Sequence, residues 1–182
     1  MATGIPAHWV EETSAEWPES SGYGSGAPML GSDPCLLDGE LPEIVGSQPR
    51  MTASGFGAYG ETDEGYRYLC SFLGEDYAGE VQLMSGDERE LIETVNEFRT
   101  TSSTSDQDNT VEEIASGELD MYVLTRWYPT NPQGMYIVLY HDEETDAIVT
   151  FEVNSLEEAP FEELGAQGAA DAFHDYLAAA GE

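Results

Sequence analysis

The chain contains no lysine, and this absence is its most informative feature. Its 182 residues include 37 acidic residues and only five basic ones, all arginine, so the formal net charge is -32. Charged residues make up 23% of the chain, close to the usual quarter, so the bias lies in the sign of the charge and not in overall polarity. The absence of lysine therefore tells us more about the solvent in which the protein works than about a functional site.

The chain also lacks the segments that membrane-spanning and secreted proteins need. The longest wholly apolar run is Met135 to Tyr140, far short of the roughly 20 residues of a spanning helix. The first residues contain neither the basic region nor the apolar region of a signal peptide. We therefore expect no membrane span and no signal peptide.

Cysteine is scarce. Cys35 and Cys70 lie too far apart for a Cys-x-x-Cys pair, and they are too few for a closed zinc site without help from histidine. We predict two buried thiols. The alternative is a disulfide, which would pin the N-terminal region onto the domain.

The acidic composition favours adaptation to high salt. In multimolar salt the Debye length falls below about 3 Å, so surface carboxylates stop repelling one another and hold water and cations instead. Lysine is disfavoured there because its long apolar stem would tend to bury. In this respect the chain resembles the proteins of salt-in halophiles, haloarchaea above all, and of the viruses that grow in them.

A mimic of DNA is the less favoured interpretation of the same charge. Its carboxylates would imitate phosphates spaced about 1.7 Å apart along the duplex axis. A mimic needs an acidic stripe, whereas the acids here are dispersed along the whole chain. Mimicry also gives no reason for removing lysine elsewhere.

Residues 1–60 differ in composition from the rest. Glycine and proline recur throughout and interrupt any helical or strand period, as in a linker. The segment nevertheless carries many large apolar side chains, so we predict an extended, irregular arm followed by a single globular domain over 61–182. The aromatic residues expected to make contacts, within the chain or with a neighbouring subunit, are Trp9, Trp17, Tyr23, Phe56 and Tyr59.

Regular patterns begin near Gly65. Apolar and branched residues bounded by glycine predict two strands, and three further segments joined by short turns predict an antiparallel meander. Capping boxes at Ser85–Glu88 and Ser155–Glu158 predict the starts of two amphipathic helices. The expected strands are 66–73, 80–84, 120–128, 134–141 and 147–153, the expected helices are 86–99 and 161–180, and 100–110 is expected to be a polar loop.

These elements predict a β-rich α+β fold. The segment 134–141 is apolar throughout, as expected of a central strand covered on both faces, and 147–153 alternates. The antiparallel sheet therefore needs a cover, which the two amphipathic helices would provide. A β-sandwich or jelly-roll arrangement of the sheet is the alternative form.

One glycine pattern matches the dinucleotide-binding fingerprint by letter. Gly55-Phe-Gly-Ala-Tyr-Gly60 fits G-x-G-x-x-G, but that motif requires a preceding strand and a following helix, and the sequence predicts neither. Nearby acids would also oppose a pyrophosphate. We therefore interpret the pattern as part of the glycine-aromatic arm.

Few residues in the sequence point to a chemical function. The three histidines, His8, His141 and His174, are scattered, and a hairpin turn carries the cation candidates Asp142, Glu144 and Asp146, for which a solvated acidic turn is the simpler interpretation. No nucleophile motif and no basic patch occur. We expect no catalytic residues, no cofactor beyond non-specific hydrated cations, and no nucleic-acid partner.

The leading hypothesis is a non-enzymatic structural subunit that assembles with copies of itself or with other subunits. In size and acidity the chain resembles the smaller jelly-roll capsid proteins of haloarchaeal icosahedral viruses, which implies a capsid, turret or tail component in a virion. The alternative is a regulatory or ligand-binding α+β domain in the cytoplasm of a salt-in halophile. An acidic DNA-mimic inhibitor is the third possibility.

Overall fold

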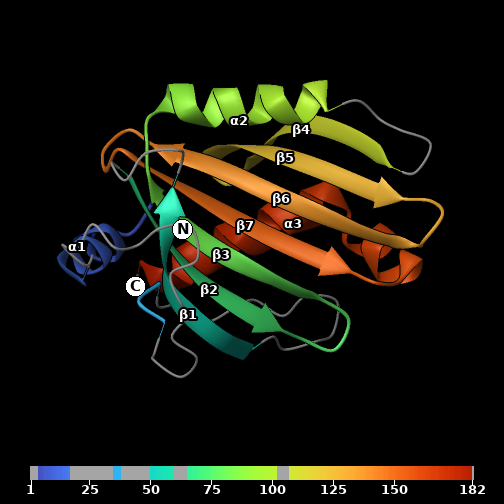
Figure 1. The fold of residues 1–182 in the computed structure, drawn as a ribbon, viewed down its shortest axis with the longest axis horizontal. Helices are drawn as coiled ribbons and strands as arrows, with labels where there is room; N and C mark the ends of the chain where they lie inside the picture. The colour runs from blue at the N-terminus through green and yellow to red at the C-terminus, as the bar shows by residue number, and fades with distance from the viewer. Residues whose placement is uncertain (1–3, 17–34, 38–49, 60–64, 102–106, 182) are drawn as a thin grey trace.

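The computed structural model describes residues 4–16, 35–37, 50–59, 65–101 and 107–181 (Figure 1). Within them, three helices accompany seven strands. The elements in chain order are α1 (Ala7–Glu16), β1 (Arg50–Tyr59), β2 (Gly65–Leu73), β3 (Ala78–Ser85), α2 (Glu88–Thr100), β4 (Asp108–Ser116), β5 (Leu119–Tyr128), β6 (Gln133–Asp142), β7 (Ala147–Ser155) and α3 (Glu158–Ala180).

All seven strands form one antiparallel sheet in the order β1-β2-β3-β7-β6-β5-β4. Two meanders, β1 to β3 and β4 to β7, meet where β3 pairs with β7. The predicted β-rich α+β class and the meander of β5, β6 and β7 are confirmed. The sandwich or jelly-roll form is not confirmed, because the strands belong to a single sheet.

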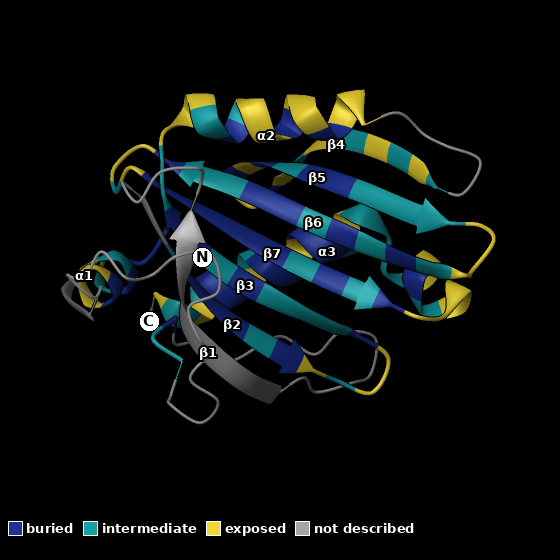
Figure 2. Ribbon diagram, viewed as in Figure 1, coloured by how far each residue is buried: buried dark blue, intermediate teal, exposed yellow. Residues whose placement is uncertain are grey.

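One face of the sheet holds the main core. Alternate residues of the strands point to α3 and pack against its apolar side, which the burial colours show as dark blue (Figure 2). Phe151 of β7 is fully buried, and its ring lies 5.6 Å from that of Phe173 in α3 and 5.7 Å from that of Phe72 in β2. Helix α3 is kinked at Gly165, and the part after the kink is thus fixed across the sheet.

Helix α2 lies on the opposite face. Its buried residues Leu91, Val95 and Phe98 contact a smaller cluster formed by Met84, Leu124, Leu139 and Ile148 of the sheet. The helix contacts β4, β5 and β6, so it covers only one part of this face. No helix in the described part of the chain is both long and apolar enough to cross a membrane.

The helix starts differ from the predicted capping boxes. Asp87 caps α2, since its carboxylate accepts from the Glu90 amide at 3.1 Å while Glu90 accepts from the Asp87 amide at 2.9 Å. At α3 the N-cap is Glu157, which makes no side-chain cap. Both predicted cap residues, Ser85 and Ser155, instead end strands, so these two predictions were wrong.

Two buried tyrosines hold the first turn of α3. Tyr77 donates to the Pro160 carbonyl at 2.5 Å, and Tyr136 donates to the Phe161 carbonyl at 2.8 Å. Burial is the main cause that raises the pKa of each phenol to about 12. Both hydroxyls therefore remain donors across the neutral range.

The N-terminal region is more regular than predicted. Residues 7–16 form α1 and residues 50–59 form β1, and Trp9 of α1 is fully buried 5.4 Å from the Tyr176 ring. The expected loop over 100–110 also differs, because β4 begins at Asp108. Edge strands are exposed, so their polar sequences do not alternate as central strands do.

Cys35 and Cys70 form a disulfide, so the prediction of two buried thiols was wrong. The bond joins residues 35–37, here called the strap, to β2. The Leu36 amide donates to the Tyr68 hydroxyl at 3.0 Å, and the Tyr176 hydroxyl donates to the Leu37 carbonyl. Since Leu37 is itself fully buried, the strap is part of the core.

Candidate functional site

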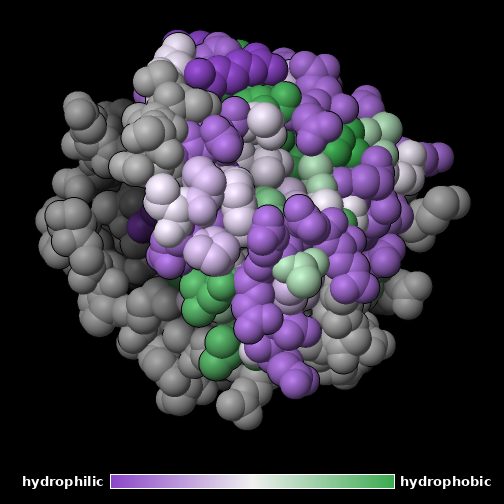
Figure 3. Space-filling model, turned by 90° about the vertical axis from the view of Figure 1, so that its right-hand side faces the viewer, coloured by the Kyte–Doolittle hydropathy of each residue, from purple (hydrophilic) through white to green (hydrophobic). Residues whose placement is uncertain are grey.

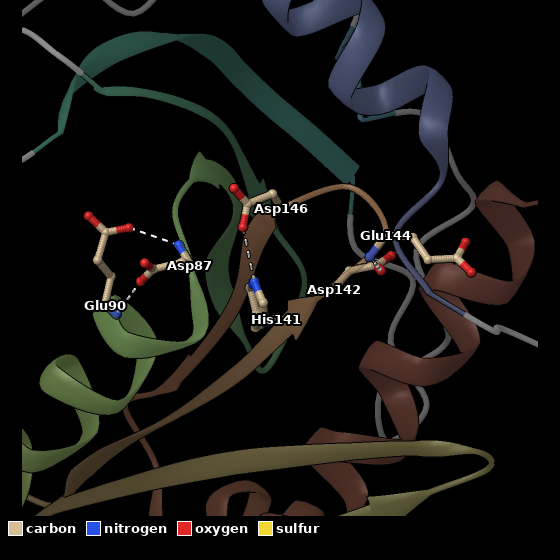
Figure 4. Close-up of polar contacts among 6 residues, drawn as sticks. All are labelled: Asp87, Glu90, His141, Asp142, Glu144 and Asp146. Atoms are coloured by element: carbon tan, nitrogen blue, oxygen red, sulfur yellow. Dashed lines mark hydrogen bonds and ion pairs between the residues drawn. The ribbon is translucent and has the colours of Figure 1, made fainter.

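The acidic turn between β6 and β7 holds the N-terminal segment in place. Asp142 is only 6% exposed, and its carboxylate accepts from the Ile5 amide at 2.7 Å. It also accepts from the Glu144 amide at 2.9 Å (Figure 4). A charged acceptor makes such hydrogen bonds strong. This carboxylate therefore binds the chain's own backbone.

The three predicted cation candidates do not converge. The Glu144 side chain points away from Asp142, and Asp146 turns toward His141, with 3.7 Å between Oδ1 and Nε2 (Figure 4). Among the residues that the structure describes, no group of three or more histidine, cysteine, aspartate or glutamate side chains is arranged to hold a metal.

The histidines lie on three different elements, α1, β6 and α3. The side chains of His141 and His174 are 10% and 12% exposed, and the Nε2 atom of each is buried with no hydrogen-bond partner in the described part of the chain. The His174 ring packs against Gly117, where an added Cβ would lie 2.3 Å from Nε2. These imidazoles are therefore packed against the fold and do not form a common site.

The structure describes three of the five aromatic residues that were predicted to make contacts. Trp9 makes its contacts within its own chain, where it is part of the core. Phe56 and Tyr59 lie in β1, with their backbones opposite Tyr68 and Gly65, and so does most of the glycine pattern. Trp17 and Tyr23 lie outside the described residues.

No helix in the described part of the chain lies over one part of the sheet face on the α2 side (Figure 1). We call this region the open face. Strand alternation places mainly polar side chains here, most of them half-buried, together with the apolar residues Leu69, Met135 and Ile137. The open face comprises Ser71 of β2, Glu80 and Gln82 of β3, and Thr150, Glu152 and Asn154 of β7.

Two carboxylates lie side by side at the centre of the open face. Glu80 and Glu152 are direct partners in the β3–β7 register. The Gln82 amide donates to Glu80 Oε1, and the Asn154 amide donates to Glu152 Oε1 at 2.8 Å. Each carboxylate is thus oriented by an amide two residues away on its own strand.

This pair is electrostatically unfavourable. Burial raises the pKa of Glu80, the nearby Glu152 charge raises it further, and the Gln82 hydrogen bond and Arg67 act in the opposite direction. Like charges directly opposite each other destabilise a sheet. A costly arrangement that the fold retains is a candidate for function.

A pocket of about 240 Å³ adjoins this pair at the end of the sheet. Asn154 faces Met135 across the β6–β7 pairing, two residues beyond Glu152. The pocket is lined by Tyr128, Gln133, Gly134, Met135, Asn154, Ser155 and Leu156, and Leu156 is 77% exposed. The end of the sheet is mainly hydrophilic, with hydrophobic residues in small separate patches (Figure 3).

Two arginines on the α2 side have different surroundings. Arg126 lies 4.8 Å from the centre of the Phe98 ring and donates from Nε to Asn109 at 3.0 Å, so its role is structural. Arg67 has a buried Nε without a hydrogen-bond partner among the described residues. Its charge lowers the pKa of Glu80 on the neighbouring strand.

Sequence reasoning missed the open face. With 37 acids in the chain, Glu80 and Glu152 do not stand out, and only the polar alternation at 80, 82, 150, 152 and 154 hinted at an uncovered face. Comparison of the chain with protein-family models, curated proteins and solved structures finds no match. Function must therefore be argued from the geometry.

Proposed function

We propose that this chain is a non-enzymatic binding domain, adapted to high salt, that holds an extended segment of a protein partner on its open face. The observation that carries the proposal is the carboxylate pair Glu80–Glu152 beside an apolar pocket, on a part of the sheet that no helix among the described residues covers. Interfaces commonly combine polar groups of this kind with an apolar anchor point.

The rigidity of the site supports binding. The open face lies on β2, β3 and β7, which are inner strands paired on both sides, and the core under α3 lies directly behind them. Side chains on such strands are held in place before a partner arrives, so little ordering is required on binding.

The proposal is closest to the regulatory or ligand-binding domain expected as the alternative. A virion subunit stays a prediction. Its form with an exchanging arm would require α1 and the strap to leave their own core, although Trp9 and Leu37 are fully buried and the disulfide ties the strap to β2. An assembly subunit that used the open face would instead self-associate through it.

A selection from a library of random 12-residue peptides, carried out in about 3 M potassium chloride so that surface repulsion is screened, tests the proposal. Affinities of recovered peptides are then measured by fluorescence anisotropy. Gln82→Trp places a large ring on the open face, and Gln167→Trp makes the same change on the exposed side of α3.

We expect recovered peptides to lose about ten-fold or more in affinity on Gln82→Trp, equivalent to about 1.4 kcal/mol, and to bind Gln167→Trp as they bind the original chain. Equal binding to both variants would show that the open face is not the site. Recovery of no peptide at all would also count against a binding function.

A further inference from the structure

We infer that the segment bound on the open face carries an arginine two residues away from a large apolar residue. This inference rests on the proposed function and specifies the chemistry of its partner. The arginine would lie over the Glu80–Glu152 pair, and the apolar side chain would enter the pocket beside Met135 and Leu156.

The spacing follows from strand geometry. Glu152 belongs to the carboxylate pair, and Asn154, two residues further along β7, lines the pocket. A strand rises about 3.3 Å per residue, so the two positions lie about 7 Å apart. An extended segment that runs along β7 presents every second side chain to the sheet at the same interval.

The charge of the pair calls for a cation. Glu80 and Glu152 each use Oε1 to accept from a neighbouring amide, and neither Oε2 accepts a hydrogen bond from the described residues. A guanidinium group has five N–H donors in a planar fork, which can bridge two carboxylates. Salt screens half-buried charges less than exposed ones, so the attraction persists in concentrated salt.

The pocket calls for an apolar group of limited size. Its volume of about 240 Å³ exceeds the space of several waters, and Tyr128, Met135 and Leu156 supply apolar surface. A leucine or methionine side chain fits such a site.

Arg67 lies at the other end of this row of side chains, where it faces Met84, four residues from Glu80 along β3 and away from the pocket. Its charge lowers the pKa of Glu80, in the direction in which a bound arginine would also act. The proposed binding site itself consists of the carboxylate pair and the apolar pocket.

The probe is a fluorescein-labelled peptide of serine and threonine with a central Arg-Thr-Leu. Three comparison peptides replace the arginine by glutamine, replace the leucine by serine, or place arginine and leucine next to each other. The protein variants are Glu80→Gln/Glu152→Gln and, as a control with the same change in charge, Glu162→Gln/Glu163→Gln on exposed positions of α3.

We expect each change in the peptide to weaken binding about ten-fold or more. The Glu80→Gln/Glu152→Gln variant should lose the same factor and should no longer distinguish arginine from glutamine in the peptide. The α3 variant should bind like the original chain.

Equal binding of all four peptides, or full binding of the central peptide to Glu80→Gln/Glu152→Gln, would overturn the inference, as would no binding at about 1 mM peptide. The two proposals fail separately. If library peptides lose affinity on Gln82→Trp but lack the arginine-apolar pattern, the open face is the site and only the inference is wrong.

Discussion

Glu80 shows at the scale of one residue how the fold tolerates a local cost. Its carboxylate lies opposite Glu152 and is half-buried, so its charged form is disfavoured in the folded protein. Proteins retain unfavourable groups mainly where function needs them. The stability of variants at this position is therefore informative.

We predict that Glu80→Gln stabilises the protein at pH 7. Because folding raises the pKa of Glu80, the folded state is favoured at low pH and loses stability as the carboxyl ionises. Removing one of two opposed charges should add roughly 0.2–1 kcal/mol to the free energy of unfolding. Urea unfolding followed by circular dichroism at pH 7 measures it.

The same experiment at a pH below the ordinary Glu value of 4.5 is the control, since the difference should vanish where the carboxyl is protonated in both states. Glu93→Gln, on the exposed side of α2, should show little change at either pH. A destabilised Glu80→Gln at pH 7 would contradict the account of the pair.

Two glycines allow a matched comparison of backbone and packing effects. Gly117 and Gly165 have φ of 61° and 65°, but only Gly117 has a neighbour, the His174 ring, where a Cβ would lie. Gly165→Ala should cost about 1–3 kcal/mol for the backbone alone, since its φ of 65° and ψ of 170° are adopted almost only by glycine, and Gly117→Ala should cost about 1 kcal/mol more because the His174 ring must also move. Thermal unfolding of both variants measures the two losses of stability. Equal losses would show that the His174 ring moves aside without a cost in free energy.

At the scale of elements, the sequence predicted the central strands better than the edges. Strands β5, β6 and β7 are apolar or alternating because their side chains meet the core, and that pattern is visible in the sequence. Strand β4 lies at an edge and is mostly exposed, so its polar residues resembled a loop. Helix α1 was not predicted, because the proline and glycine residues around it interrupt the helical pattern of the sequence.

The capping boxes show why local signals can mislead. Ser85 pairs with Ala147, and Ser155 pairs with Gly134, so each serine is the last residue of a strand. The backbone of each serine pairs within the sheet, and α2 begins only after the next capping residue, Asp87. The pairing of distant strands determined the structure at both serines, and such pairing cannot be predicted from the neighbouring residues in the sequence.

The strap provides a test of how far residues 35–37 contribute to the fold. The disulfide joins residues 35 positions apart, so replacing both cysteines by alanine should lower the free energy of unfolding by about 3–4 kcal/mol. Urea unfolding of the oxidised chain and of Cys35→Ala/Cys70→Ala measures the loss. A difference below about 1 kcal/mol would mean that the buried Leu37 and the hydrogen bonds hold the strap without the bond.

Because α1 and the strap belong to the core, deleting them does not test whether they exchange between subunits. Deleting residues 1–50 removes Trp9, Leu37 and Cys35 from the core and the disulfide. Loss of assembly after that deletion would therefore not identify an exchanging arm. Variants of the open face separate assembly from folding more cleanly.

At the scale of the whole molecule, charge is distributed unevenly. All five arginines lie between residues 50 and 126, and α3 carries five acids and no basic residue. Its outer side therefore has no internal counter-charge. Such a surface repels itself strongly unless ions screen it.

We predict that the protein unfolds when salt is removed. Between about 3 M and 0.1 M potassium chloride the Debye length grows from below 3 Å to about 10 Å, so the carboxylates begin to repel one another across the surface. Circular dichroism during dilution should show loss of structure that returns when salt is restored. A chain that keeps its full signal and melting temperature at 0.1 M would contradict adaptation to high salt.

The fold class was predictable from the sequence, but the candidate site was not. The site requires β3 to lie beside β7 in one register, which sets Glu80 against Glu152 although 72 positions separate them. It also requires α2, which packs on Met84 and Ile148 of the same two strands, to leave Glu80 and Glu152 uncovered. Both facts depend on packing between distant segments, and the abundance of acids hides the two that matter.

The side-chain amides of the open face allow the most direct test of the central claim. Gln82 and Asn154 give NH₂ signals in a ¹H–¹⁵N spectrum, and Gln167 on α3 serves as the internal control. Titration with a selected peptide in high salt should shift the signals of Gln82 and Asn154 and leave that of Gln167 in place. Shifts at Gln167 with none at Gln82 and Asn154 would contradict binding on the open face.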